Sequence, residues 1–314
     1  MRTHTDRRQM PAPAGPPRRL ARQLLALLLA TLLLAQIAAA ATASVESPAA
    51  TPAATPPVRV AVVGGLVLCG VWPALAALAE QATGLSIETV GAAPKEGVVP
   101  LFRAGEADLL IIHGSDEAYA LLAAGDAAPL RAWAFNEHVI VGPLADPAGV
   151  RGVANGAEAI RRIVAADAPL MGFRDPGSFT ITHALFRTAG RKPGPRQQLF
   201  DDGERPQDVL VAAARHGAYA VVGHIPVAFG KMPSTGTRVL LAGDPAMRRV
   251  YVVVEPGPRH PADTARRERA HRLADYLLGS AGQRDLLAAD HAAGGPWIFP
   301  LPAAAVAGSA EDSR

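Results

Sequence analysis

The sequence predicts an α/β protein with two lobes. Short apolar runs typical of buried strands alternate with segments whose apolar residues recur at helical spacing. Glycines close several of the helical segments, as expected at helix ends. A succession of strand, helix, strand, helix and strand indicates a parallel sheet. The pattern fills about 58–302, which is long enough for two modest domains.

Each half of this region supplies its own set of elements. In the first half we predict strands at 58–63, 86–90, 108–113 and 137–142, and helices at 72–82, 98–104 and 117–124. In the second half we predict strands at 170–173, 219–223, 238–241 and 250–255, and helices at 157–166, 179–188, 208–216, 265–278 and 282–289. No internal repeat is evident.

Residues 1–43 are predicted to be an export signal that is removed. An arginine-rich start, an apolar run at 24–35 and a small-residue ending, Ala41-Thr42-Ala43, form the expected pattern. A retained anchor is the alternative, but the run is shorter than the roughly 20 apolar residues that span a bilayer. Both Sec and twin-arginine export remain open. We therefore expect a periplasmic protein.

The ends of the exported chain have the composition of disordered segments. Residues 44–57 are mostly Ala, Thr and Pro and are predicted to be a linker, and 303–314 are predicted to be a tail. The signal holds six arginines and one aspartate of the chain's 31 basic and 28 acidic residues, which leaves 25 basic and 27 acidic residues. The basic character therefore belongs to the signal, and no nucleic-acid partner is expected.

Cysteine and histidine give no pattern of a metal site. Cys69 is the single cysteine, which excludes an intramolecular disulfide and a cysteine-based zinc site. His113, His138, His183 and His224 show no ligand spacing on one element. Scattered polar histidines are therefore favoured over a metal site, and no cofactor is expected.

A predicted strand-loop-helix in the second half carries a candidate anion site. Arg174, Ser178 and Thr180 lie where the helix begins, and helix N-termini present unpaired N–H groups with partial positive charge. The arginine can add a charge-assisted, bidentate contact to an oxyanion. In the alternative interpretation Ser178 is only an N-cap, and Arg174 pairs with Asp175 or Asp201.

Several segments, in their order and spacing, resemble one known family. They are GEADLLIIH at 105–113, NEHVIVGPLADPAG at 136–149, AYA at 218–220, GDP at 243–245, GQ at 282–283 and PWIFP at 296–300. The chain is similar to the extracellular solute-binding proteins of ABC importers, specifically the tungstate-binding branch. The likeness covers nearly all of 58–302.

The resemblance implies a two-lobed, periplasmic-binding-protein-like fold of type II with two crossing hinge strands. Lobe one would comprise 58–142 and 240–302, and lobe two 143–239. The hinge would lie at Val139 and Val252. The implied function is a monomeric, non-catalytic substrate-binding protein of an ABC transporter. It would capture a small anion, such as a tungstate- or molybdate-like oxyanion, and pass it to an inner-membrane permease.

The family's site maps onto both lobes. In lobe two the family has R-x-x-x-S-x-T followed by His; Arg174, Ser178 and Thr180 keep that spacing, while Thr182 and His183 supply a Thr-His pair two residues late. In lobe one the family's hydroxyl-rich loop aligns with Gly64 and Gly65. Glycines permit close approach of the backbone to a ligand.

Lobe one departs from the family's pattern at its other loops too. The loop after Gly91 carries Pro94-Lys95-Glu96, and Gly223-His224 replaces a polar Asp-Arg pair. Lys95 or His224 could compensate, although loop positions without ligand contact are the favoured interpretation. These changes leave the identity of the anion open.

Other functions remain as alternatives. A hydrolase triad of Ser178, His183 and Asp175 is disfavoured, because no G-x-S-x-G elbow is present and the serine and histidine share one helix start. A sensor or binding module of the same fold, with a different small-molecule ligand, would fit the altered loops. The arginines in 266–272 form either a solvated helix face or a permease-docking surface.

Overall fold

The computed structural model describes residues 55–201 and 205–302. The predicted signal, most of the predicted linker and the predicted tail lie outside the described residues. Within those ranges, every helix is too short or too polar to cross a membrane.

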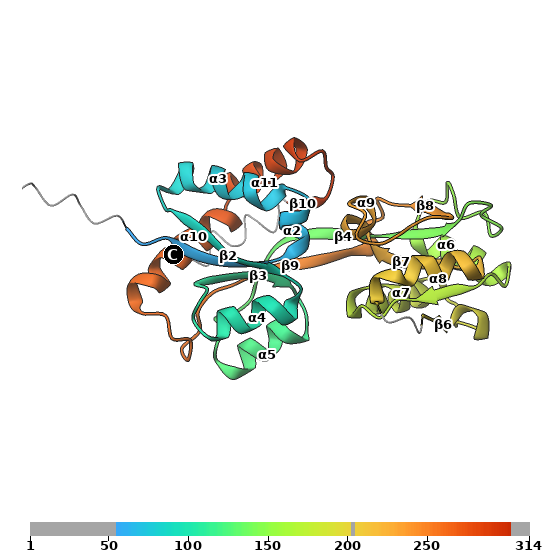
Figure 1. The fold of residues 1–314 in the computed structure, drawn as a ribbon, viewed down its shortest axis with the longest axis horizontal. Coiled ribbons are helices and arrows are strands. Elements are labelled where there is room, and N and C mark those ends of the chain that lie inside the picture. The colour runs from blue at the N-terminus through green and yellow to red at the C-terminus, as the bar shows by residue number, and fades with distance from the viewer. Residues whose placement is uncertain (1–54, 202–204, 303–314) are drawn as a thin grey trace, which may run out of the picture. The chain divides into compact units, whose positions relative to one another are not determined.

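A single mixed sheet runs through the described chain (Figure 1). Its main path has the strand order β2-β1-β3-β9-β4-β7-β5-β6, and β8 and β10 both pair with β4. The strands are β1 (Val58–Val63), β2 (Ile87–Ala93), β3 (Leu109–His113), β4 (Arg131–Pro143), β5 (Leu170–Gly172), β6 (Leu199–Phe200), β7 (Tyr219–Gly223), β8 (Thr237–Leu241), β9 (Arg248–Val254) and β10 (Ile298–Pro300).

The predicted parallel pairing is found in each lobe, but the strands at the centre of the sheet pair in the antiparallel direction. β1 is parallel to β2 and β3, and β5 is parallel to β6 and β7. β9 is antiparallel to β3 and to β4, and β4 is antiparallel to β7. The sheet is therefore mixed, because β4 and β9 run in opposite directions between two parallel groups.

Local sequence explains where the helices begin and end. Asn155 accepts a hydrogen bond from the Glu158 N–H at 2.9 Å and starts α6, while Gly84 and Gly125 end α3 and α5 in the left-handed conformation. The helices are α2 (Gly64–Leu68), α3 (Val71–Thr83), α4 (Lys95–Arg103), α5 (Asp116–Ala124), α6 (Gly156–Ala165), α7 (Pro176–Ala189), α8 (Val209–His216), α9 (His224–Ala228), α10 (Thr264–Leu278) and α11 (Ser280–Ala292).

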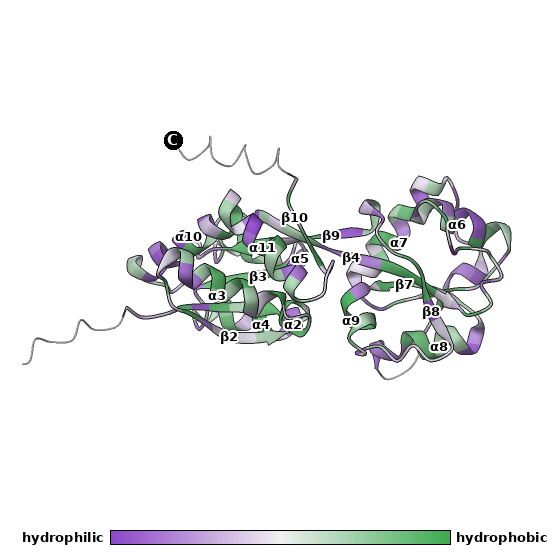
Figure 2. Ribbon diagram, turned by 90° about the horizontal axis from the view of Figure 1, so that it is seen from above, coloured by the Kyte–Doolittle hydropathy of each residue, from purple (hydrophilic) through white to green (hydrophobic). Residues whose placement is uncertain are grey.

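The first lobe surrounds the core built on β1, β3 and β9. Their buried aliphatic residues pack against α3, α10 and α11, and Trp72, Trp133 and Tyr251 are among the largest fully buried side chains. Figure 2 shows hydrophobic colour on β3 and hydrophilic colour on parts of α10. Burial of this apolar surface is the main favourable contribution to folding.

The second lobe has helices on both faces of its sheet. Ile140 and Tyr219 belong to one core with residues of α6 and α7. Their neighbours Val139 and Ala220 belong to another core with residues of α8. Successive strand residues point to opposite faces, so alternate positions of β4 and β7 supply the two cores.

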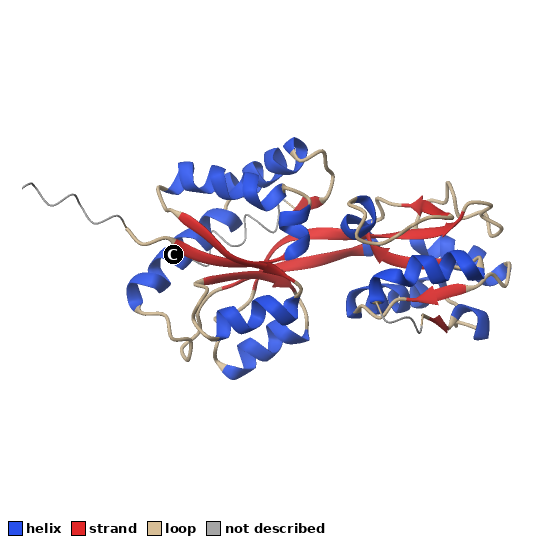
Figure 3. Cartoon of the chain, in the orientation of Figure 1, coloured by secondary structure: helices blue, strands red, loops and turns tan. Residues whose placement is uncertain are grey.

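The packing of the second lobe extends past the predicted limits of 143 and 239. Val139, Leu240 and Met247 lie in its cores, because β8 pairs with β4 at Ile140 to Pro143. Val252 lies in the first core. The strands therefore pass between the lobes at Asn136–Glu137 and Arg248–Arg249, and Figure 3 shows them as long arrows continuous from one lobe to the other.

Candidate functional site

Polar side chains share one sheet face where β4 and β9 cross. Asn136 and His138 are two residues apart on β4, and Asn136 pairs with Arg249 of β9. His113, at the end of β3, pairs with Tyr251, which is two residues from Arg249. Residues opposite one another, or two apart on a strand, point to the same face. We call His113, Asn136, His138 and Arg249 the hinge stripe.

Three side chains of the hinge stripe hold buried atoms with unused hydrogen-bonding capacity. His113 Nε2, Asn136 Oδ1 and His138 Nδ1 have no hydrogen-bond partner among the described residues. Burial, reinforced by the positive charge of Arg249, lowers the pKa of His113 well below its usual range. An unpaired buried polar group costs about 1–3 kcal/mol, so a cluster of them indicates a site that a ligand completes.

The first turn of α7 packs on the hinge stripe. A side-chain Cβ at Gly177 would lie 2.2 Å from Arg249 Nη1, so a larger residue there would push the guanidinium away from the helix. Ser178 is 1% exposed, and its Oγ has no partner in the described part of the chain. The helix start thus brings a hydroxyl and N–H groups to an arginine.

Asp175 connects α7 to the hinge stripe. Its carboxylate accepts a hydrogen bond from the Ser178 N–H at 2.8 Å and lies 3.7 Å from Arg249 Nη1 and 4.0 Å from His138 Nε2. Burial alone would raise the pKa of Asp175, but His138, the Ser178 N–H and Arg249 hold it well below its usual range. Asp175, and not Ser178, is the N-cap of α7, so the alternative role of Ser178 as N-cap is wrong.

A cavity of about 420 Å³ adjoins this cluster and is lined by both lobes. Its first-lobe side is the start of α5, and its second-lobe side is the start of α7. The lining residues are Lys95, Gly114, Ser115, Asp116, Glu117, Tyr119, Pro176, Gly177, Thr180, Ile181, Arg248, Arg249 and Val250. We call this cavity the cleft.

Lys95 and Glu117 form an ion pair at the first-lobe edge of the cleft. Lys95 Nζ and Ser115 Oγ donate to Glu117 Oε2 at 2.8 Å and 2.6 Å. Burial opposes ionisation, but these hydrogen bonds lower the pKa of Glu117 to about 2. Lys95 is therefore already paired, and its charge is not freely offered to a ligand.

Replacing Lys95 with methionine should raise the pKa of Glu117 from about 2 toward the ordinary value of roughly 4.3. A depressed carboxyl pKa stabilises the fold above the unfolded-state pKa, and this contribution is lost as the pH falls toward 2. Titration of the Glu117 side-chain carbon by NMR measures the shift. Lys192→Met, at an exposed position, is the control, and an unchanged Glu117 titration in Lys95→Met would contradict the assignment.

Gly64 and Gly65 begin α2 and are not among the residues that line the cleft. A Cβ at Gly65 would lie 4.0 Å from Ile225 of α9, which is 2% exposed and belongs to the first-lobe core although α9 follows β7. The start of α2 therefore faces an apolar contact between the lobes. Arg174 is exposed in the turn before α7.

The predicted site residues Thr180, Thr182 and His183 of α7 line two different cavities. Thr180 lines the cleft and donates to the Pro176 carbonyl at 2.8 Å. Thr182 donates to the Ser178 carbonyl at 2.7 Å, and Thr182 and His183 line another cavity of about 210 Å³. His183 packs against Phe179 in that cavity, with ring centroids 4.1 Å apart and the ring planes tilted by 58°.

The predicted scattered histidines are partly brought together. His113 and His138 join the hinge stripe, while His224 Nδ1 lies 2.8 Å from the buried Glu137 Oε1. No group of three potential metal ligands forms in the described ranges. His113, Asn136, His138 and Arg249 were missed as site residues. In the sequence, they are marked only by polar residues at every second position of strands that are otherwise apolar.

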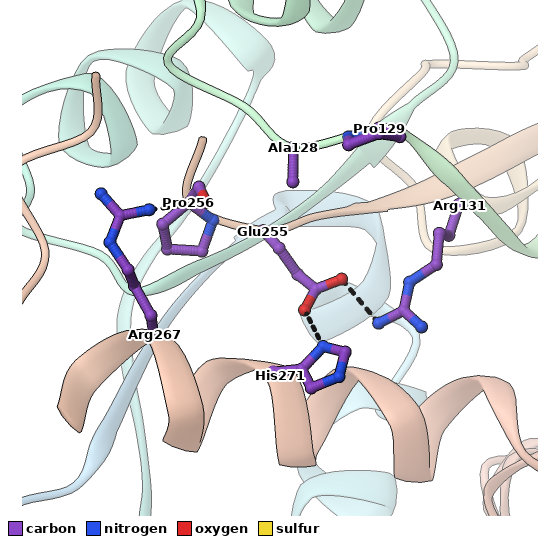
Figure 4. Close-up of a pocket in the computed structure, with 7 residues that line it drawn as sticks. All are labelled: Ala128, Pro129, Arg131, Glu255, Pro256, Arg267 and His271. Atoms are coloured by element: carbon purple, nitrogen blue, oxygen red, sulfur yellow. Dashed lines mark hydrogen bonds and ion pairs between the residues drawn. The ribbon is translucent and has the colours of Figure 1, made fainter. Parts of the chain in front are cut away.

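A further hollow of about 440 Å³ lies in the first lobe beside α10 (Figure 4). Glu255 lies between Arg131 Nη2 at 2.6 Å and His271 Nδ1 at 2.7 Å. Arg131 Nη1 also donates to Asp275 at 2.7 Å. The guanidinium of Arg267 donates to the backbone carbonyls of Pro256, Gly257, His260 and Ala262. Both arginines of the hollow are therefore already hydrogen-bonded, and this hollow is a weaker candidate for an anion than the cleft.

Comparison with curated proteins finds a partial match. No protein-family model matches the chain. A Haloferax volcanii protein, provisionally described as an ABC transporter anion-binding protein, is 30% identical over 142 residues. The match covers 45% of this chain and 38% of that protein, so the chain spans about two fifths of the length of this relative.

Comparison with solved structures identifies the fold. The tungstate ABC transporter protein of Geobacter sulfurreducens superposes with a TM-score of 0.58 and 21% identity, covering 74% of this chain and 97% of that one. The tungstate-binding protein TupA of Desulfovibrio alaskensis superposes with a TM-score of 0.60 and 20% identity, covering 79% and 99%. The chain has the two-lobed, periplasmic-binding-protein-like fold of type II, which confirms the predicted fold class.

Proposed function

We propose that the protein is the substrate-binding component of an ABC importer that captures a small oxyanion in the cleft. The observation that carries this proposal is the junction of α7 with the hinge stripe. There, one arginine, one hydroxyl and a helix N-terminus meet three further side chains with unpaired buried atoms. Such an arrangement can replace the hydration shell of an anion.

Each group would have a separate task in binding. Arg249 would supply the positive charge, since its side chain is 13% exposed and its contact with Asp175 is long, at 3.7 Å. Ser178 Oγ and the N–H of Gly177 would add neutral donors, which are stronger in a water-excluded cleft than in water. From the predicted set, Ser178 would touch the anion, with Thr180 and Arg174 at the rim. Thr182 and His183 would have no role in it.

The lobes would close on the anion by bending β4 and β9 where they cross. Gly64 and Gly65 would take part through the contact of α2 with Ile225, which buries apolar surface between the lobes. A permease in the inner membrane would then receive the closed form. The proposal includes export after removal of 1–43, a monomeric state and no catalytic step.

The relatives support this function through what their names state. Two proteins of the same fold are named for tungstate, and the curated relative is named for an anion and an ABC transporter. The fold alone hosts many ligands, so the oxyanion assignment depends on the chemistry of the cleft.

Thermal unfolding of the purified protein with single oxyanions tests the proposal. A ligand at 100 times its Kd adds about 2.7 kcal/mol to the free energy of unfolding, which raises Tm by roughly 5–10 °C for a chain of this size. We expect such a rise with at least one of phosphate, sulfate, molybdate and tungstate. Chloride at equal ionic strength is the control. The proposal would be contradicted if none of these oxyanions raised Tm above the value measured in chloride. Uptake of the bound anion by cells lacking the gene tests delivery to a permease.

A further inference from the structure

His138 holds a buried ring nitrogen on the sheet face that it shares with Asn136 and Arg249. Its Nε2 lies 4.0 Å from the Asp175 carboxylate, which favours the tautomer with the proton on Nε2. In a neutral ring this tautomer leaves a lone pair on Nδ1. That atom is buried, in a side chain that is 3% exposed, and no described residue offers it a partner.

Asn136 provides an acceptor two residues away on the same face. Its Oδ1 is also buried without a protein partner in the described ranges, and the residue is 8% exposed. An amide can turn to offer either oxygen or nitrogen. The imidazole has less of this freedom, because the Asp175 carboxylate beside Nε2 favours the proton on that nitrogen. The site therefore combines donors, Arg249 and Ser178, with at least one acceptor.

The charged side chains around the cleft also limit which anions it can hold. The cations that line it or touch its lining are matched in number by carboxylates. They are Lys95, Arg248 and Arg249 against Asp116, Glu117 and Asp175. A dianion with no proton would meet no surplus of positive charge among these residues, and its bare oxygens would face the lone pair of His138.

We infer that the ligand is an anion that carries its own hydrogen-bond donor, an inference that rests on the proposed function. The anionic oxygens would bind Arg249 and the start of α7, and an O–H of the ligand would donate to His138 Nδ1. Hydrogen phosphate and small hydroxycarboxylates have this chemistry near neutral pH. Sulfate, molybdate and tungstate, which carry no proton there, lack it.

Calorimetric titration with two matched pairs of anions tests the inference. Phosphate and sulfate have the same shape and differ in the proton, and lactate and propionate differ in the hydroxyl. We expect the donor-bearing member of the preferred pair to bind at least about 100-fold more tightly, because a site built to pair with an O–H rejects the analogue without it. Which pair binds tells whether the source is an inorganic or an organic anion.

Variants at the acceptor separate this effect from general anion affinity. His138→Phe removes the lone pair and should reduce the preference at least about tenfold, while His183→Phe, in the separate cavity, should leave it unchanged. Asn136→Asp replaces an amide by an acceptor-only group and should increase the preference even if overall affinity falls. This second variant keeps the test decisive if His138→Phe does not fold.

The outcomes distinguish the inference from the proposed function. Binding of sulfate, molybdate or tungstate as tight as that of phosphate would overturn the inference and leave the proposed function standing. A preference unaffected by either variant would also overturn it. Absence of binding for every anion, at concentrations up to the millimolar range used for weak ligands, would overturn both.

Discussion

Replacing Arg249 with methionine is expected to weaken anion binding by about 30-fold or more. Removing one member of a buried, charge-assisted contact typically costs about 2–5 kcal/mol, and each 1.4 kcal/mol is tenfold in Kd. Methionine keeps a flexible, unbranched side chain and removes the guanidinium that lies against Gly177. Titration calorimetry with the tightest-binding anion measures the loss.

Arg248→Met is the matched control for this prediction. Arg248 also lines the cleft and carries the same charge, but it is the next residue along β9 and pairs with Glu137, so its side chain leaves the strand on the face opposite the hinge stripe. Its guanidinium lies 3.8 Å from the centre of the Phe299 ring. We expect a change of only a few-fold in Kd. Equal losses in both variants would show that the effect comes from net charge and not from the hinge stripe.

Replacing Asp108 with alanine is expected to lower the free energy of unfolding by about 3–5 kcal/mol, the usual cost of breaking a buried ion pair. Asp108 is 1% exposed. It accepts hydrogen bonds from the Arg59 backbone N–H at 2.9 Å, from Arg59 Nη2 at 3.1 Å and from Arg266 Nε at 2.6 Å. Alanine would leave two half-buried guanidinium groups without their carboxylate.

Urea unfolding at several pH values checks both the size and the sign of this effect. Burial opposes ionisation, but the bonds from Arg59 and Arg266 lower the pKa of Asp108 below its usual range. Its stabilisation is therefore full above the unfolded-state pKa of roughly 3.9 and declines as the pH falls below that value. The difference between wild type and Asp108→Ala should shrink in acid.

Asp126→Ala is the comparison for the Asp108 experiment. The side chain of Asp126 pairs with Arg103 at 3.2 Å, and Arg103 is 56% exposed. An exposed pair of this kind contributes only about 0–1 kcal/mol. If Asp108→Ala were as mild as Asp126→Ala, the two arginines would not depend on Asp108.

The regular elements of the fold could be predicted because their signals are local. The strand 58–63 and the strand 219–223 have the predicted limits, since each is an apolar run bounded by glycine or by a helix end. The short helices α2 and α9 were missed. Each has only five residues and starts directly after a strand, so neither has room for a helical repeat.

The strand β4 begins six residues earlier than predicted, at Arg131 instead of 137. Its first half carries Arg131, Asn136 and Glu137, and polar residues of this kind are not typical of a buried strand when the local sequence is considered alone. Pairing with β9, more than a hundred residues later, holds this half in the sheet. Long-range pairing of this kind leaves no local pattern for a single sequence to show.

One part of the candidate site could also be found from the sequence, and another part could not. Ser178 could be found because the turn before α7 is a contiguous motif. The hinge stripe could not, because His113, Asn136 and Arg249 come from three strands and share a face only through their register. The apolar contact of Gly65 with Ile225 could not be predicted either, because no residue near Gly65 in the sequence indicates that Ile225 lies beside it.

The continuity of β4 through both lobes limits how the protein can be divided by truncation. Trp133 fills the first core, and Val139 and Ile140 fill the cores of the second. A fragment confined to 143–239 would lose the strand on which β7 and β8 assemble, together with Met247. Viable dissection therefore calls for complementary fragments that both retain a copy of this strand, or for cuts in surface turns that leave β4 and β9 whole.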